Sequence, residues 1–138
     1  MKSKKIWLGR EKKKYVVVKV ADTREEMQAF YEKWTGSEQE SVEGVHLAFT
    51  RFEKHKDGRC MSPQTGIVLL HRGRLGAGVV THELMHAVLW AKQHKWKRED
   101  YPRVIRSMDE EERLLHQHTY AVQQFYDWYW KKLAPAQE

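Results

Sequence analysis

Residues 78–90 read GVVTHELMHAVLW and place two histidines, His82 and His86, four positions apart with Glu83 directly after the first. Side chains four positions apart on an α-helix project from the same face, one turn from each other. Two imidazoles in that arrangement can ligate one zinc ion. Glu83, about 100° further round the helix, lies beside the ion, where a base can take a proton from a water molecule. The spacing therefore predicts a helix that carries a catalytic zinc site.

The same stretch is apolar around most of the helix. Val79 and Leu89 share the histidine face, and four apolar residues form the opposite one: Leu84, Ala87, Val88 and Ala91. A helix with this pattern is expected to be buried on several sides. Burying two imidazoles and a carboxylate costs free energy unless they have partners or bind a metal. The surrounding residues therefore favour a metal site over two unrelated histidines.

The composition is that of one folded domain, which we assign to residues 1–138. Of 138 residues, 41% are hydrophobic and 32% are charged, which is typical of a globular chain and not of a disordered one. No apolar run is long enough to span a membrane, and the basic N-terminus is not followed by a signal-peptide core. The single cysteine, Cys60, excludes an internal disulfide framework. We therefore expect a cytoplasmic protein without a membrane partner.

Hydrophobic periodicity predicts an α+β fold in the order β–α–β–β–α–α. Strands are expected over 14–20, 44–55 and 66–73, and helices over 22–34, 77–93 and 107–132, with N-caps at Asp22 and Ser107. The turn signal Asp57-Gly58 predicts a hairpin. The result would be a small, mostly antiparallel sheet, a helix carrying the histidines, and a long C-terminal helix.

Positive charge is concentrated in residues 1–14, which hold seven Lys or Arg and one Glu and so account for the whole net charge of +6. Such a segment is typical of a solvated, flexible arm and could contact nucleic acid or an acidic partner. A second basic stretch, KQHKWKR at 92–98, is not part of a recognised nucleic-acid motif. An alternative function is therefore a zinc-containing binding module that acts through the arm without turnover.

VVTHELMHAV resembles the extended motif of the zincin metallopeptidases, in which uncharged residues surround the two histidines. GIVLLHRG at 66–73 resembles the zincin edge strand, which pairs with an extended substrate. The resemblance covers roughly residues 66–130 and is to the compact zincins of bacteria and their phages. It implies a zincin-like fold, a bound Zn²⁺ and hydrolysis of peptide bonds in a protein or peptide substrate. His82 and His86 would be zinc ligands, and Glu83 would be the general base.

A catalytic zinc usually has three protein ligands, so a third must be found. In the metzincin branch a glycine and a third histidine would stand where this chain has Leu89 and Lys92, so that branch is excluded. The H-G-x-x-F stretch of the SprT-type proteases does not occur. His94 is the nearest downstream histidine, but we expect it to lie past the end of the helix.

The gluzincin branch takes a glutamate from the next long helix, and Glu111 is the best candidate here. At about 100° per residue, Glu111 lies at the centre of an apolar stripe made of Leu114, Leu115, His118, Val122, Phe125 and Tyr129. Glu112, on a polar row, is an alternative ligand, and His116 and His118 are others. Acidic residues in a first helical turn are also favoured by the helix dipole alone.

Two parts of the gluzincin pattern are not filled by an obvious residue. Leu115 stands where many gluzincins have an acidic residue that orients a zinc ligand. A stabiliser for the developing oxyanion is also required. His118 is the best candidate for it because it shares the face of Glu111, and the others are His71, Tyr101 and Tyr120.

Overall fold

The computed structural model describes residues 1–37, 43–48, 52–55, 58–61, 63–93 and 108–134. His94, Tyr101, Ser107 and most of the second basic stretch lie outside these ranges. In chain order the strands and helices are β1 (Lys2–Trp7), β2 (Tyr15–Ala21), α1 (Arg24–Thr35), β3 (Gly44–Ala48), β4 (Phe52–His55), β5 (Gly58–Met61), β6 (Gln64–His71), α2 (Ala77–Gln93) and α3 (Met108–Trp128). A short turn of 3₁₀-helix (Arg72–Arg74) precedes α2, and a π-helical turn (Tyr129–Leu133) continues α3. The predicted α+β class is confirmed.

The main sheet has the strand order β1-β2-β6-β3. The sheet is mixed, because β2 and β6 are parallel, but its two outer pairs are antiparallel, so most of its pairings are antiparallel as predicted. Strand β6 lies inside the sheet, so the expectation that 66–73 is the edge strand is wrong, and β3 takes that place. The reason is visible in the burial of β6, whose residues from Thr65 to His71 are all buried and therefore need neighbours on both sides.

The strand predicted over 44–55 is divided between two sheets. Its first part is β3, and its second part, β4, pairs with β5 in a separate two-stranded antiparallel sheet. The antiparallel register of that pair, His55 opposite Gly58, agrees with the predicted hairpin, while Asp57 of the predicted turn lies outside the described residues.

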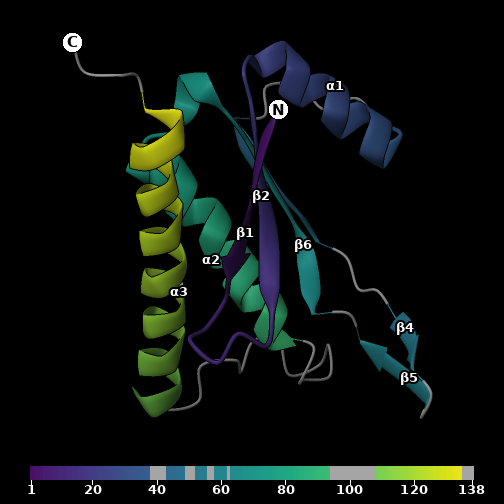
Figure 1. Ribbon diagram of the computed structural model, residues 1–138, viewed down its shortest axis with the longest axis vertical. Helices are drawn as coiled ribbons and strands as arrows, with labels where there is room; N and C mark the ends of the chain where they lie inside the picture. The colour runs from purple at the N-terminus through teal and green to yellow at the C-terminus, as the bar shows by residue number, and fades with distance from the viewer. Residues whose placement is uncertain (38–42, 49–51, 56–57, 62, 94–107, 135–138) are drawn as a thin grey trace.

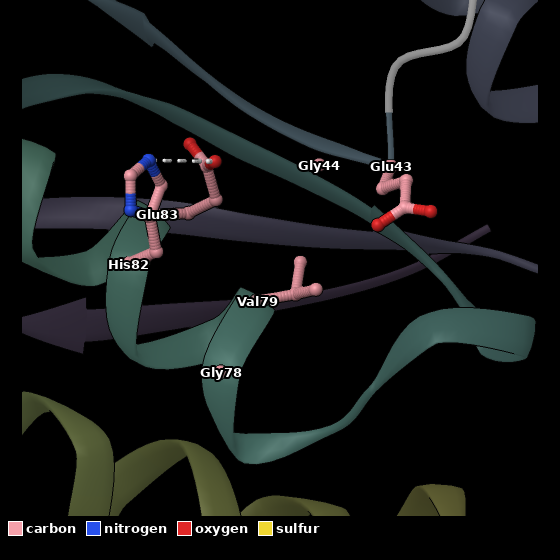
Figure 2. A pocket seen from close by; sticks show the side chains of 6 residues that line it. All are labelled: Glu43, Gly44, Gly78, Val79, His82 and Glu83. Atoms are coloured by element: carbon pink, nitrogen blue, oxygen red, sulfur yellow. Dashed lines mark ion pairs between the residues drawn. The ribbon is translucent and has the colours of Figure 1, made fainter.

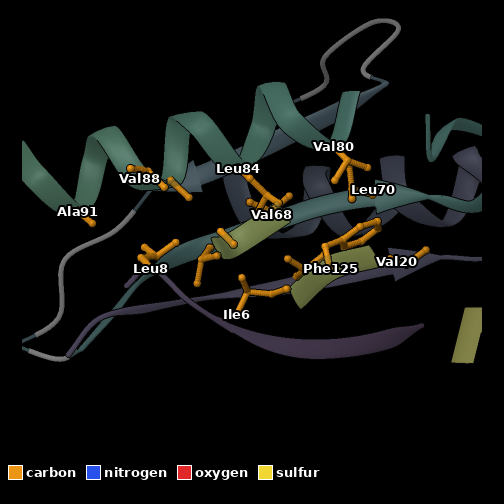
Figure 3. Packing of buried hydrophobic residues seen from close by; sticks show 14 of the residues in the cluster. Ile6, Leu8, Val20, Val68, Leu70, Val80, Leu84, Val88, Ala91 and Phe125 are labelled. Carbon is orange, nitrogen blue, oxygen red and sulfur yellow. The ribbon is translucent and has the colours of Figure 1, made fainter. Parts of the chain in front are cut away.

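Helices α2 and α3 lie on one face of the main sheet, and α1 covers one end of the other face (Figure 1). The core lies between the sheet and the two long helices (Figure 3). Alternate residues of the strands enter it together with one stripe of each helix: Ile6, Val16, Val18, Val20, Val68, Leu70, Val80, Leu84, Val88, Leu114, Ala121 and Phe125. The buried residues of the strands alternate along the chain on the side where the helices lie, and one side of each of the two helices faces these residues. Together they form a single apolar layer.

The basic N-terminal segment is part of the sheet, so the prediction of a flexible arm over 1–14 is wrong. Residues 2–7 form β1, where Ile6 is fully buried, and Leu8 just beyond it is 5% exposed. Gln124 of α3 fixes the outer edge of this strand, because its amide accepts from the Trp7 N–H at 2.9 Å and donates to the Trp7 carbonyl at 2.8 Å. The lysines of β1 reach solvent, while Ile6 and Leu8 anchor the segment.

Helix α2 has the bounds that the sequence predicts, whereas α1 begins later than expected. Thr23, not Asp22, is its N-cap, and the Thr23 hydroxyl accepts from the Glu26 N–H at 3.1 Å. The Glu26 carboxylate in turn accepts a hydrogen bond from the Asp22 N–H, so Glu26 gives this backbone N–H a partner at the start of the helix. None of the described helices is long and apolar enough to cross a membrane.

Replacing Ile6 with alanine tests whether β1 belongs to the core. We expect Ile6→Ala to lower the free energy of unfolding by about 3 kcal/mol, because a fully buried side chain leaves a cavity. Lys4→Ala, on the same strand but exposed, should change it by less than about 0.5 kcal/mol. Denaturant unfolding measures both values, and equally small effects would mean that the segment does not pack on the core.

Candidate metal centre and active site

The two histidines of the motif lie on the side of α2 that faces away from the core. Val80, Leu84, Ala87 and Val88 are buried against the sheet, so His82 and His86 are exposed, the His82 side chain to 67%. The expectation that this helix is buried on several sides is therefore wrong on the histidine side. Glu83 points elsewhere and is only 8% exposed. Figure 2 shows its carboxylate beside the His82 ring.

The imidazoles of His82 and His86 converge on one point. Their Nε2 atoms are 3.1 Å apart, and the ring planes are 82° to each other. Two nitrogens bound to one tetrahedral zinc at about 2.0–2.1 Å lie about 3.3–3.4 Å apart. A hydrogen bond from one neutral ring to the other also fits a separation of 3.1 Å. The helix thus holds both nitrogens slightly closer together than two ligands of one ion, at a distance that a ring-to-ring hydrogen bond also gives.

The Glu83 carboxylate lies between α2 and the edge strand β3. Its Oε1 is 3.9 Å from His82 Nε2, and the backbone N–H of His46 donates a hydrogen bond to the carboxylate. Burial raises the pKa of Glu83, and the charges of His82 and His86 together with that hydrogen bond act in the opposite direction. A carboxylate whose pKa is raised holds a proton more firmly, which suits a general base.

The close approach of β3 and α2 depends on Gly44. A Cβ at this position would lie 2.9 Å from Val79 Cγ1 and 3.3 Å from Glu83 Cγ, which is too close for a side chain. Beside this contact is a pocket of about 240 Å³ lined by Glu43, Gly44, Gly78, Val79, His82 and Glu83 (Figure 2). At its rim Glu43 forms an ion pair of 3.0 Å with Arg74. The pocket offers space for a small group next to the Glu83 carboxylate.

His46 is a residue of this region that the sequence reasoning missed. It alternates with Val45 and Leu47, which face the α1 side, so it lies on the α2 side of β3 with Gly44. Its Nε2 is buried, and none of the described residues gives it a hydrogen-bond partner. Burial, and secondarily the charge of His86, lower its pKa to about 4. The alternation of Val45, Leu47 and Phe49 was the available signal, because it assigns His46 to the other face.

The imidazole of His46 occupies the space that a side chain at position 66 would fill. A Cβ on Gly66 would lie 2.7 Å from His46 Nε2 and 2.6 Å from the Leu47 carbonyl oxygen, and the glycine has φ +153°. Gly66 therefore allows the His46 ring, with its Nε2 buried, to lie over the sheet.

The structure does not bring Glu111 to the two histidines. Glu111 is exposed in the first turns of α3, and Leu115, which was expected on the same inward stripe, is 48% exposed. The buried stripe is instead made of Leu114, Ala121 and Phe125. At about 100° per residue its centre lies about 60° away from Glu111. Glu111 is therefore not at the centre of the inward face as predicted.

The other candidates for the third ligand do not complete a metal site with His82 and His86 either. Glu112 is exposed and lies 3.3 Å from His116 on its own helix. His118 Nε2 is 2.9 Å from the Thr81 carbonyl, so this ring links α3 to α2 and is not among the residues that line the pocket. Among the described residues, no set of three His, Cys, Asp or Glu side chains is grouped to hold a metal ion.

Neither of the other described candidates for an oxyanion stabiliser lines the pocket. His71 is buried at the end of β6, and the Tyr120 ring has Arg10 5.1 Å from its centroid. His94 and Tyr101 are outside the described residues.

Stability should depend on pH through His46. Its folded-state pKa of about 4 is below the ordinary 6.5, so the unfolded chain binds the proton more tightly. The stability gained from keeping His46 neutral is complete above pH 6.5 and is lost as the pH falls toward 4. For chelator-treated protein we expect the difference in unfolding free energy between wild type and His46→Leu to change by about 3 kcal/mol across that window.

Denaturant titrations at several pH values between these limits measure this difference. His116→Gln is the control, because its side chain is 81% exposed and should leave the pH dependence unchanged. A His46→Leu variant with the pH profile of the wild type would contradict the assignment.

We compared the chain with protein-family models, curated proteins and solved structures, and none of them matches it. The interpretation of function therefore depends on the chemistry of His82, Glu83 and His86 in their places on α2.

Proposed function

We propose that this protein is a zinc-dependent peptide hydrolase of the zincin type. The observation that carries the proposal is the pair of Nε2 atoms 3.1 Å apart on one exposed helix face, with a buried carboxylate directly beside them. Burying a carboxylate costs free energy unless it is hydrogen-bonded or paired, and Glu83 has the His46 backbone N–H and the His82 ring beside it. Both features fit a site built to bind a metal and to move a proton.

The donor set suits zinc at two positions. His82 and His86 would hold the ion, which when bound supplies Lewis acidity toward a water molecule and a substrate carbonyl. The third protein ligand is not assigned, because Glu111 and Glu112 lie away from the pair. Two imidazoles on one rigid helix turn are nonetheless a preorganised pair of ligands, since their backbone positions do not move when the ion enters.

Glu83 is the residue that would carry the proton. Its carboxylate takes a proton from the attacking water as the water oxygen adds to the scissile carbonyl carbon. The same proton is then delivered to the nitrogen of the leaving amine as the C–N bond breaks. The hydrogen bond from the His46 backbone holds the carboxylate in place, and burial raises its pKa, so that it binds the proton more readily. The pocket beside Glu83 would accept a small substrate group.

Metal content and turnover test the proposal together. Wild-type protein should purify with about one zinc per chain, and His82→Ala or His86→Ala should lose it. Glu83→Gln should keep the zinc but lower the hydrolysis of a panel of unstructured proteins by at least about a hundredfold, because only the base is removed. Elemental analysis and a gel-based cleavage assay measure these outcomes.

A matched control comes from α3, where His116 is also an exposed histidine one turn from an acidic residue. His116→Gln should keep both zinc and activity. Metal-free protein, or Glu83→Gln with wild-type activity, would refute the proposal. Stoichiometric zinc without cleavage in any variant would instead support a metal-stabilised binding module.

A further inference from the structure

The face of the sheet opposite α2 and α3 carries lysines and aromatic rings. In the β1–β2 pair, Ser3 lies opposite Lys19, Lys5 opposite Val17, and Trp7 opposite Tyr15. These six residues alternate with core residues of the same two strands, so their side chains project to the other side of the sheet. This surface is thus separated from the histidine motif by the thickness of the sheet.

The lysines and rings of this face are in contact. Lys5 Nζ lies 4.3 Å from the ring centroid of Tyr15 and 5.3 Å from that of Trp7. The two rings meet edge to face with their centroids 5.4 Å apart. Two residues further along the pair, Lys19 Nζ lies 3.2 Å from the Ser3 hydroxyl and 5.9 Å from the Phe30 ring of α1.

Helix α1 continues this surface and does not close it. It covers only the end of the sheet where β2 finishes (Figure 1). On α1 the rings of Phe30 and Trp34 are stacked 12° from parallel, and Trp34 is 46% exposed. Two aromatic pairs therefore stand at the ends of the surface with two ammonium groups between them. We call this surface the lysine–aromatic face and define it by Lys5, Trp7, Tyr15, Lys19, Phe30 and Trp34.

The charge of this face is not neutralised by nearby carboxylates. Among the described residues, neither Lys5 nor Lys19 has an ion-pair partner. Residues 1–35, which contain both strands and α1, hold ten Lys or Arg and five Asp or Glu. The potential over this side of the molecule is therefore positive, and it favours an anionic ligand.

We propose that the lysine–aromatic face binds single-stranded nucleic acid. Proteins that bind single strands combine a basic surface that follows the backbone with aromatic rings on which bases stack. Trp7 and Trp34 supply rings at two ends, and Lys5 and Lys19 lie between them for the phosphates. A duplex keeps its bases stacked within the helix and cannot use the rings. An acidic peptide would use the lysines but has no base to stack, so the rings favour the nucleic acid.

Binding of a fluorescein-labelled oligothymidylate about twelve nucleotides long, followed by anisotropy, tests the proposal with the full chain. We expect log K to fall with log salt with a slope of about −1.4 between about 50 and 200 mM NaCl, because two lysines meet phosphates. Lys5→Gln should reduce the slope by about 0.7. Trp7→Ala should weaken binding about tenfold through lost stacking, while Trp7→Phe should keep most of the affinity.

Lys131→Gln is the matched control, because Lys131 is an exposed lysine after α3, on the other side of the sheet. It should change the affinity by less than about twofold. Circular dichroism of each variant separates loss of binding from loss of folding. Three results would overturn the proposal: no binding at low salt, equal affinity for a duplex of the same length, or an affinity for polyglutamate that matches the oligonucleotide and does not change in Trp7→Ala.

Discussion

The packing of α2 on the sheet is the constraint on which the candidate site depends. Val80, Leu84, Ala87 and Val88 are buried, and their burial fixes the rotation of the helix about its axis. With that rotation set, His82 and His86 can only face outward, and Glu83 can only face β3. A helix rotated by one residue position, about 100°, would bury a histidine and release the carboxylate to solvent. The burial of the apolar residues of the motif thus determines the directions in which its polar side chains point.

Close approach between helix and strand is the second element of this arrangement. Gly44 lets β3 come near enough for the His46 N–H to reach the Glu83 carboxylate, and Gly66 leaves room for the His46 ring. Neither glycine has a chemical role of its own. Each removes a side chain at a point where two elements must nearly touch: Gly44 beside the buried Glu83 side chain, and Gly66 beside the buried Nε2 of His46.

The sequence was most informative where one periodic pattern dominated. Helix α2 has the predicted bounds because its apolar residues recur at helical spacing over four turns. Strand β1 was not predicted, because seven basic residues surround Ile6, Trp7 and Leu8. The alternation of apolar and polar residues that marks a strand is therefore too short to recognise in this segment. In α3, the six residues assigned to the inward stripe around Glu111 are spread over a broad arc of the helix circumference. A helical wheel cannot tell which part of such an arc faces the core, and the tertiary contacts placed Leu114 inside and Glu111 outside. Alternation in the sequence assigns His46 to the face opposite Val45 and Leu47, but only the pairing of β3 with β6 beside α2 places that face at the motif.

The two ends of the sheet are not equivalent as surfaces for self-association. At the β1 end, Gln124 already occupies both backbone groups of Trp7, and Lys2, Lys4 and Lys5 add repulsion between like copies. Among the described strands, β3 is the only other end of this sheet. Growth of an ordered fibre requires two adhesive edges on every molecule. A copy that associated through β3 would present a charged, amide-capped strand outward, so strand-to-strand association would stop at a pair.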